Sequence, residues 1–371
     1  MIQIFLSLLK LGIGTSKASD EECQKLLLLP MQEWQEVMAL AERQGVLAIA
    51  VDDLQVLMEA HKGEIVAQNE NPEKWQLWLL ENIGQLTQYE MMNHQQKKVI
   101  VELSEMWAAE GIQMMVFKGQ ANAALYPKPE HRAVGDIDCW LFGDAEKGDE
   151  VAKAHGAEVS FDWYRHSKIS YKDETIENHR VMSHTRGSKL KREMEDDLRF
   201  MVNDSRLPVL EGCGKAVRPS AQFNACFLTY HGLHHFLSEG LRMKQILDWT
   251  MFLQKEQDKV DWNAYWIFCK KYKLERFAAL MTYIATEYLG VETNTNLTKD
   301  THIKVLAEKV MKSTLYDDDY LFNSGKSDWM IRWLLVKNML TRDRWKYRDV
   351  AQENVLKHLW QNTTGYLFDK N

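Results

Sequence analysis

Long stretches of the chain repeat apolar side chains every three or four residues, the pattern of an amphipathic helix. Two of them are "MQEWQEVMALAERQG", which follows Pro30, and "PEKWQLWLLENIGQLTQYEMMNHQQKKVIVELSEMWAAEG", which ends at Gly111. Proline suits the first turn of a helix and glycine its end. The first stretch therefore predicts one helix, and the second predicts one long helix or two in series. The pattern is helical from residue 1 to about 110.

The pattern changes between residues 112 and 182. "IQMMVF" is an apolar run of strand length, and "GDIDCWLF" alternates, with Asp136, Asp138 and Trp140 on one face and apolar residues on the other. "AEVSFD", "HSKISYK" and "TIENHRVM" predict three more strands, the last two joined by a tight turn at "DE". "DAEKGDEVAKAHG" predicts a short helix between the second and third strands. Together these segments predict a small mixed sheet.

Helical periodicity returns after "LPVLEGCGKAVRPS" and continues to the end of the chain. The apolar stripe of "QFNACFLTYHGLHHFL" runs from Phe223 to Leu237, and "DWMIRWLLVKNML" aligns Trp329 with Trp333. The 13 tryptophans occur mostly at helical spacing, so we expect them in the core. The predicted fold class is α+β and predominantly helical, with a small mixed sheet flanked by N-terminal and C-terminal helical regions.

Composition and charge narrow the class of protein. The chain has 371 residues, of which 45% are hydrophobic, and more than one domain is the default expectation. The net charge of -7 argues against duplex nucleic acid, because phosphate binding needs a concentrated basic surface. The basic cluster "HTRGSKLKRE" is followed at once by "MEDD". We interpret it as a solvated, locally neutralised segment.

Cysteine usage and the apolar start of the chain indicate a cytoplasmic protein. The five cysteines are scattered and lack a C-x-x-C spacing, which fits a reducing compartment. "MIQIFLSLLKLGIG" is short and interrupted by Lys10, so it predicts a buried helix rather than a signal peptide or membrane span. No later stretch reaches the length that spans a membrane.

The second strand carries the candidate chemistry. Asp136 and Asp138 project from one face, and two like charges about 4 Å apart repel by roughly 4 kcal/mol at an effective dielectric of about 20. A hard divalent cation such as Mg²⁺ offsets that repulsion, and two such ions are typical of phosphate chemistry. This chemistry usually needs a third carboxylate, for which Glu177 is the best candidate. An exposed strand face would explain Glu177 equally well.

A second group of residues suits phosphate. Gly119 at a strand end lets backbone N–H groups approach phosphate oxygens, and Lys118 supplies a point charge. The alternative for Lys118 is a surface lysine. Arg132 either holds a triphosphate oxygen or forms a structural salt bridge. Asp248 either lines the cleft or lies on a helix surface.

Three histidines, His231, His234 and His235, have a spacing that could serve zinc. No carboxylate or cysteine stands at a matching offset, and His234 lies on the apolar stripe of its helix. We interpret them as core or interface residues and assign no metal to them.

The segment "VFKGQANAALYPKPEHRAVGDIDCWL" resembles the core motif of the uncharacterised nucleotidyltransferase family, within the DNA polymerase β-like nucleotidyltransferase superfamily. The family motif is approximately an apolar residue with Lys-Gly, a helix, Leu-Tyr-Pro, a turn, Arg, a spacer, and Asp-Ile-Asp with an apolar run. All of these elements occur here in order. "HGLHHFLSEGLRMKQILDW" resembles the helical half that follows this core. The resemblance covers roughly residues 90 to 255.

The resemblance implies roles for individual residues. Asp136 and Asp138 would bind metal, and Glu177 would match the third carboxylate, although the residues that flank it depart from the family pattern. Lys118 and Gly119 occupy the position where the superfamily has a Gly-Ser pair that cradles phosphate. The serine hydroxyl of that pair is missing here.

The resemblance also implies an organisation and an activity. We expect an N-terminal helical region (1–95), a nucleotidyltransferase-like core (96–205) and a C-terminal helical domain (206–371). The chain would transfer an NMP group from an NTP to an acceptor hydroxyl or phosphate with two Mg²⁺ ions, and Glu177 would help deprotonate the acceptor. The alternatives are a degenerate relative that binds a nucleotide or a partner without chemistry, and a helical scaffold whose Asp-Ile-Asp is incidental.

Overall fold

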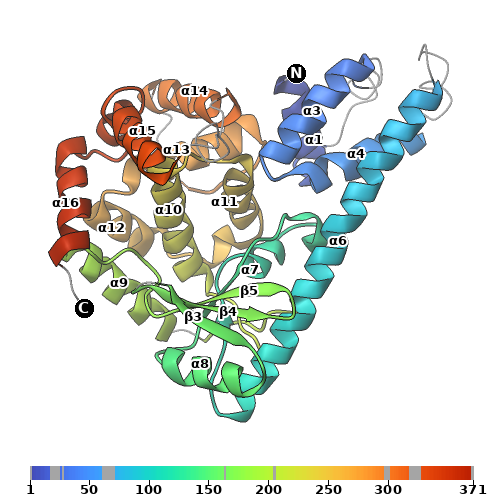
Figure 1. The fold of residues 1–371 in the computed structure, drawn as a ribbon. Helices are drawn as coiled ribbons and strands as arrows, with labels where there is room; N and C mark the ends of the chain where they lie inside the picture. The colour runs from blue at the N-terminus through green and yellow to red at the C-terminus, as the bar shows by residue number, and fades with distance from the viewer. Residues whose placement is uncertain are drawn as a thin grey trace.

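The computed structural model describes residues 2–16, 26, 29–60, 72–162, 164–203, 206–295, 301–316 and 327–368. These residues form many helices and one five-stranded mixed sheet, which confirms the predicted fold class (Figure 1). In the described parts of the chain, no helix has both the length and the apolar character needed to cross a membrane. Cys23 falls outside the described residues.

The N-terminal region contains the helices that its periodicity predicts. Their bounds are α1 (Ile2–Gly12), α3 (Met31–Arg43), α4 (Leu47–Ala60) and α6 (Pro72–Ala109). α1 buries Phe5 and Leu8, as expected for an amphipathic core helix. α6 is a single helix of 38 residues, and Gly111, at φ 75°, follows its end. Figure 1 shows α6 running along one side of the molecule, from the N-terminal helices to the sheet.

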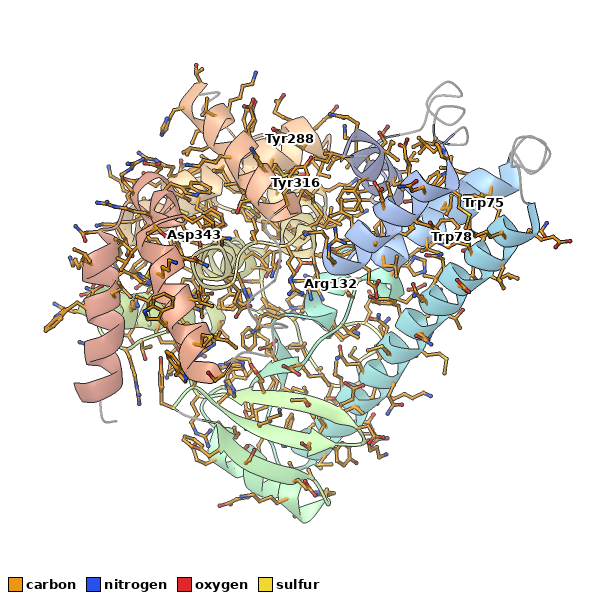
Figure 2. The ribbon with its side chains drawn as sticks, turned by 45° about the horizontal axis from the view of Figure 1, so that its top comes forward. Trp75, Trp78, Arg132, Tyr288, Tyr316 and Asp343 are labelled. Carbon is orange, nitrogen blue, oxygen red and sulfur yellow. The ribbon has the colours of Figure 1, made fainter. Side chains whose placement is uncertain are left out.

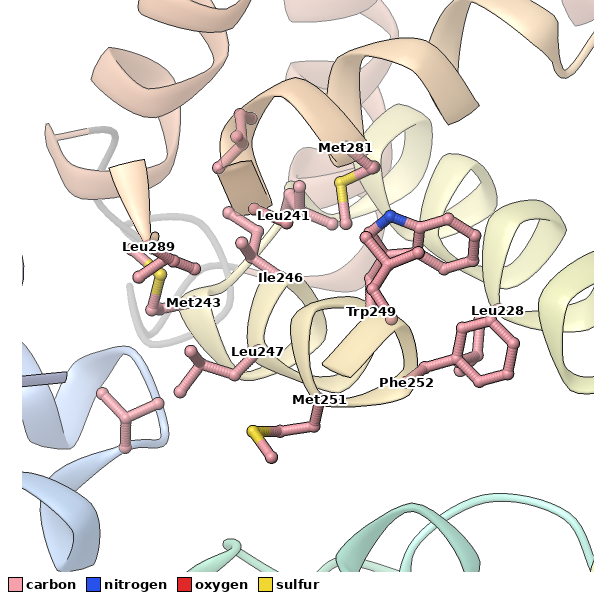
Figure 3. Close-up of a cluster of buried hydrophobic side chains, with 14 of the residues drawn as sticks. Leu228, Leu241, Met243, Ile246, Leu247, Trp249, Met251, Phe252, Met281 and Leu289 are labelled. Carbon is pink, nitrogen blue, oxygen red and sulfur yellow. The ribbon is translucent and has the colours of Figure 1, made fainter. Parts of the chain in front are cut away.

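Several helices of the C-terminal region, among them α9, α12 and α13, contact α10 or α11. The bounds of the helices in this region are α9 (Lys189–Asn203), α10 (Ala221–Ser238), α11 (Met243–Glu256), α12 (Trp262–Tyr272), α13 (Glu275–Tyr283), α14 (Thr301–Tyr316), α15 (Asp328–Leu340) and α16 (Val355–Phe368), with short helical turns η2 (Gln257–Lys259), η3 (Ile284–Tyr288) and η4 (Lys346–Val350). α11 buries apolar side chains around most of its circumference, among them Leu247, Trp249 and Phe252 (Figure 3). Such a helix lies inside a core rather than on a surface.

One apolar core joins the two helical regions. Side chains of α1, α3 and α4 belong to the same buried cluster as side chains of α10, α11 and α13. The predicted boundary at 95/96 falls inside α6, whose bounds are Pro72–Ala109. Since one helix serves both regions, the predicted domain division stays a prediction.

The sheet contains the five strands that the sequence predicts. Their bounds are β1 (Met115–Val116), β2 (Ile137–Trp140), β3 (Glu158–Asp162), β4 (His166–Tyr171) and β5 (Glu174–His179), in the order β1-β2-β5-β4-β3. β2 and β5 are parallel, and the other neighbours are antiparallel. The β4–β5 turn is at Lys172 and Asp173, at φ 49° and 65°, one residue earlier than predicted. Two positive φ values are typical of a hairpin turn whose twist matches that of its strands.

The two faces of the sheet differ in polarity. One face carries Ile137, Cys139, Ile169 and Ile176, which pack in an apolar cluster with side chains of α6 and of α8 (Ala145–Ala154). Because side chains alternate along a strand, Asp138 and its register neighbours belong to the opposite face. The predicted division of "GDIDCWLF" into two faces is confirmed.

The expectation that the tryptophans are core residues is wrong for α15 and α16. Trp329 is 67% exposed, Trp333 56% and Trp360 70%, whereas Trp34, Trp107 and Trp249 are buried as predicted. α15 turns the positions on its other side, including Met330 and Ile331, partly inward. Helical spacing shows that apolar residues share a face, but it does not show which face packs inward.

Candidate active site

Asp138 and Glu177 are direct neighbours on adjacent parallel strands. Asp138 of β2 is the register partner of Glu177 of β5, and Lys168 of β4 is the next partner along the sheet. Residues in register project from the same face. The structure therefore brings two of the three predicted carboxylates together on the polar face.

His179 bridges these two carboxylates. Its Nε2 lies 2.9 Å from Oδ1 of Asp138 and 3.2 Å from Oε2 of Glu177. The imidazole side chain is fully buried, and Phe117 packs against it edge to face, with 5.0 Å between ring centroids. The ring is therefore fixed in place, and it holds both acidic side chains in one geometry.

His166 adds a second imidazole to the same face. It is the register partner of His179, and its Nε2 lies 3.6 Å from Oε1 of Glu177. One ligand atom each of His166, Glu177 and His179 lies within 4.8 Å of the other two. Carboxylate oxygen and imidazole nitrogen together suit divalent ions from Mn²⁺ to Zn²⁺. Sequence reasoning missed His166 because only the strand register places it here.

Lys118 contacts the central carboxylate. Its Nζ forms an ion pair with Oδ1 of Asp138, and both side chains are largely buried. Burial acts to raise the pKa of Asp138, but Lys118 and His179 outweigh it and hold that pKa below its usual range. Asp138 is therefore ionised at neutral pH, in the form that a metal ion or a cationic group binds.

Asp136 precedes β2 and is the most exposed of the three carboxylates. Partial burial raises its pKa, and the charges of Glu177 and Asp138 raise it further. Burial also acts to raise the pKa of Glu177, but the hydrogen bond with His179 outweighs burial. The net result is a lowered pKa for Glu177. The three carboxylates are thus close enough to repel one another. That repulsion is what a divalent cation would relieve, so the donor set fits such an ion.

Gly119 lies directly beside the aspartate strand. Its φ of 52° and ψ of -112° fall in a region that side chains with a Cβ rarely adopt, and it precedes the short helix α7 (Gln120–Ala123). A Cβ built at Gly119 would lie 3.7 Å from the backbone oxygen of Asp136. The Lys-Gly pair and the first aspartate are therefore neighbours in space, as the motif predicts.

Polar side chains of α6 fix the loop that leads into β2. Asn93 donates hydrogen bonds to the backbone oxygens of Glu130 (2.8 Å) and Arg132 (3.1 Å), and Gln96 donates one to Gly135 (2.6 Å). Gln120 donates in turn to Asn93 (2.8 Å). Hydrogen bonds from buried side-chain amides hold this loop in one conformation. The sequence contains a signal for this contact with the loop, because Asn93 and Gln96 are two amides three residues apart on one predicted helix.

Arg132 does not lie beside Lys118, Gly119 or the three carboxylates of the site. Its position does not match the phosphate-binding role expected for it. Its guanidinium forms a two-point ion pair with Asp248 of α11, with Nε 2.7 Å from Oδ1 and Nη2 2.8 Å from Oδ2. Asn122 and Tyr126 also hydrogen bond to that carboxylate. Arg132 is 6% exposed, and Figure 2 shows it in the interior of the molecule. The geometry agrees with the salt-bridge alternative, and Asp248 is buried (5% exposed) rather than a surface acid.

Two of the three histidines of α10 pack against other rings, as expected for core or interface residues. The ring of His231 stacks on Phe227, with 5.4 Å between centroids, and burial holds its pKa well below the usual range. His234 packs against His184, with 4.1 Å between centroids. The ring of His234 thus contributes to packing between α10 and the loop that follows β5.

A comparison with protein families gives a match over most of this architecture. The family described as "Uncharacterised nucleotidyltransferase" matches residues 30–290. The chain belongs to this family. No curated protein and no solved structure matches the chain. The family match is wider than the resemblance over residues 90–255, so α3, α4, α12 and α13 are part of the region that family members share.

Proposed function

We propose that the chain is a metal-dependent nucleotidyltransferase, which transfers an NMP group from an NTP to an oxygen of an acceptor molecule. Family membership supports nucleotidyl transfer in general. The observation that carries the proposal is the register pairing of Asp138 with Glu177, with Asp136 beside them on the same polar face. Three mutually repelling carboxylates on one face form a cation site.

Asp136, Asp138 and Glu177 would hold the metal, with Mg²⁺ as the proposed ion and two ions as the proposed number. His166 and His179 widen the donor set toward Mn²⁺. When bound, divalent ions would supply charge that activates the attacking oxygen and neutralises the leaving pyrophosphate.

The chain's own residues would bind and orient the substrates. Lys118 would contact a phosphate oxygen from its position beside Asp138, and Gly119 would let the backbone approach the same phosphate group. An acceptor oxygen forms a bond to the α-phosphorus, the bond from that phosphorus to the β-phosphate oxygen breaks, and pyrophosphate leaves. Glu177 is ionised because of His179, so it can accept the acceptor's hydroxyl proton.

We assign Arg132 a positioning role. Its ion pair with Asp248 ties the loop before β2 to α11, and thereby fixes where Asp136 enters the site. The motif implies a phosphate contact from Arg132, and that contact stays a prediction. Measuring both the stability and the NTP binding of an Arg132 variant tests it. We also propose a cytoplasmic location, which the four free, buried cysteines of the described chain support.

The experiment that tests the proposal is the double variant Asp136→Asn with Asp138→Asn. Mg²⁺-dependent pyrophosphate release is measured with each of the four NTPs, and circular dichroism verifies the fold. We expect release to be lost in the double variant and unchanged in Asp196→Asn, which alters an exposed carboxylate of α9. Equal turnover in the double variant and the wild type would rule out this site.

A second candidate is a relative that binds a nucleotide without chemistry. The ion pair between Lys118 and Asp138 favours it, because a protein cation already engages the central carboxylate. Thermal stabilisation by NTP and Mg²⁺ separates the two candidates, since a ligand at 100 times its dissociation constant adds about 2.7 kcal/mol. Stabilisation without pyrophosphate release, over a broad panel of acceptors, would support the binding protein.

A further inference from the structure

A large cavity lies next to the candidate site, and the transfer chemistry described above does not use it. Its volume is about 610 Å³, and its walls come from the loop after β5, from α9 and α10, from the turn between α12 and α13, and from residues 351–361. Cavities of this size hold small molecules and bury most of their surface.

The cavity carries an excess of positive charge. Arg186, Lys191, Lys273 and Lys357 line it, against one carboxylate, Glu353. Burial lowers the pKa of Lys191, and Glu353 opposes that shift. A partly buried cation of this kind gains most from an anionic partner that is also removed from water. The "HTRGSKLKRE" cluster, interpreted from sequence as a solvated segment, therefore places two of its cations in a cavity wall.

The remaining walls are apolar. Met194, Leu233 and Leu274 line the cavity and are buried, and the ring of Tyr230 stands beside them. A triphosphate is strongly hydrated along its whole length and gains little from such walls. A molecule with an apolar body and a single anionic group matches both the charge and the walls.

The cavity and the candidate site share a wall of aromatic side chains. The backbone N–H of His184 donates to the hydroxyl of Tyr230 (2.8 Å), and both residues line the cavity. Phe227 contacts the ring of Tyr230 on one side and Phe117 on the other, with 6.4 Å and 5.3 Å between centroids. Phe117 in turn packs on His179. A molecule in the cavity is therefore separated from the carboxylate site by packed rings and not by a separate domain.

We propose that this cavity binds a small molecule with a carboxylate or phosphate group on an apolar body, as a ligand separate from the substrates of the transfer. The proposal rests on the lining of the cavity and not on the proposed function. The triphosphate itself is assigned to Lys118 and Gly119.

The first experiment measures binding to the wild-type chain by isothermal titration calorimetry with octanoate, octyl phosphate, octan-1-ol and octylammonium. We expect the two anions to bind at least about tenfold more tightly than the neutral and cationic probes. The tighter of the two anions identifies the anionic group. Equal binding of all four probes, or binding of none, overturns the proposal.

Two variants locate the binding. Lys191→Gln and Lys357→Gln each remove one charge from the cavity, and we expect each to weaken anion binding by about tenfold. Lys357 is exposed, so its variant folds even if Lys191→Gln does not. Lys153→Gln removes an exposed charge on α8 and should change nothing. Unchanged affinity in both cavity variants would overturn the assignment.

Nucleotide binding separates this proposal from the proposed function. Stabilisation by ATP with Mg²⁺ should persist in Lys191→Gln and be lost in Asp138→Asn. Loss in Lys191→Gln would show that the nucleotide occupies the cavity, and would overturn the assignment of the cavity to a separate anion. If none of the four NTPs stabilises the wild type, the proposed function fails, whatever the anionic probes show.

Discussion

Arg132 and Asp248 form a two-point ion pair in the interior, although 116 residues separate them in the sequence. Burial acts to lower the pKa of Arg132, but Asp248 outweighs burial and raises it. The pair fastens the loop before β2 to the C-terminal helices, so the position of the aspartate strand depends on a contact between two regions of the chain.

Arg132→Gln should be strongly destabilising, because it leaves Asp248 charged and buried without its partner. The expected loss in the free energy of unfolding is about 3–5 kcal/mol, measured by urea denaturation. Arg132→Met combined with Asp248→Leu removes both charges, so the free energy of unfolding of this double variant should be closer to that of the wild type. A stable Arg132→Gln protein that no longer binds NTP would instead identify Arg132 as a phosphate ligand.

Gly119→Ala should be destabilising through backbone strain alone. The φ of 52° disfavours any residue with a Cβ, whereas the space around the new Cβ is sufficient. We expect a loss of about 1–2 kcal/mol and weaker NTP binding. Gly84→Ala in α6 is the matched control, because it has open space and no positive φ, and it should stabilise the helix by about 0.5–1 kcal/mol. A stable Gly119→Ala protein with normal NTP affinity would remove Gly119 from the site.

Gly187→Ala tests the contact between the loop after β5 and α16, two segments that form part of the cavity wall. Gly187 has a φ of 79°, and a Cβ there would overlap the backbone oxygen of Gln361 in α16. The variant should displace α16 and weaken the binding of octyl phosphate. Gly212→Ala has a similar φ of 71° but open space around the Cβ, so it measures strain without overlap. Equal probe affinity in the two variants would contradict the close packing of α16 on Gly187.

Asp53 should make stability depend on pH. Burial and the neighbouring Asp52 raise the pKa of Asp53 from 3.8 to about 8, and its Oδ2 has no hydrogen-bond partner among the described residues. The folded chain therefore holds a proton that the unfolded chain releases above its lower pKa. The stabilisation is complete below about pH 4 and is lost as the pH rises to about 8.

Asp53→Asn should remove this dependence and increase the free energy of unfolding at pH 8 by at least about 2 kcal/mol. Urea midpoints at pH 5 and pH 8, for the wild type, this variant and Asp196→Asn, measure the effect. Parallel pH profiles for all three proteins would show that Asp53 is ionised in the folded state.

The sequence predicted the strands and the carboxylate faces because both depend on local alternation. Asp136 and Asp138 share a face on any strand, whatever its neighbours. The turn at Lys172 and Asp173 was placed one residue late, because the positive φ of Lys172 comes from the hairpin twist and not from a glycine. The local sequence pattern determines which face of a strand a side chain lies on. The pairing of two strands determines the backbone angles of the turn that joins them.

The remaining features depend on contacts between distant segments. His166 joins the site only because β4 pairs with β5 in a register that aligns it with His179. Arg132 has the spacing of a phosphate ligand, but Asp248 arrives from another helix and engages it. The exposure of Trp329 likewise depends on which side of α15 meets the rest of the fold. No periodicity in one segment contains this information.

The continuity of α6 has a consequence for motion. The helix is described over its whole length and continues without a break through residue 95. Its Asn93 and Gln96 hydrogen bond to the loop that leads into β2. A hinge needs element ends that absorb a change of backbone angles, and an intact helix offers none. Domain closure around a substrate therefore has no pivot at this junction.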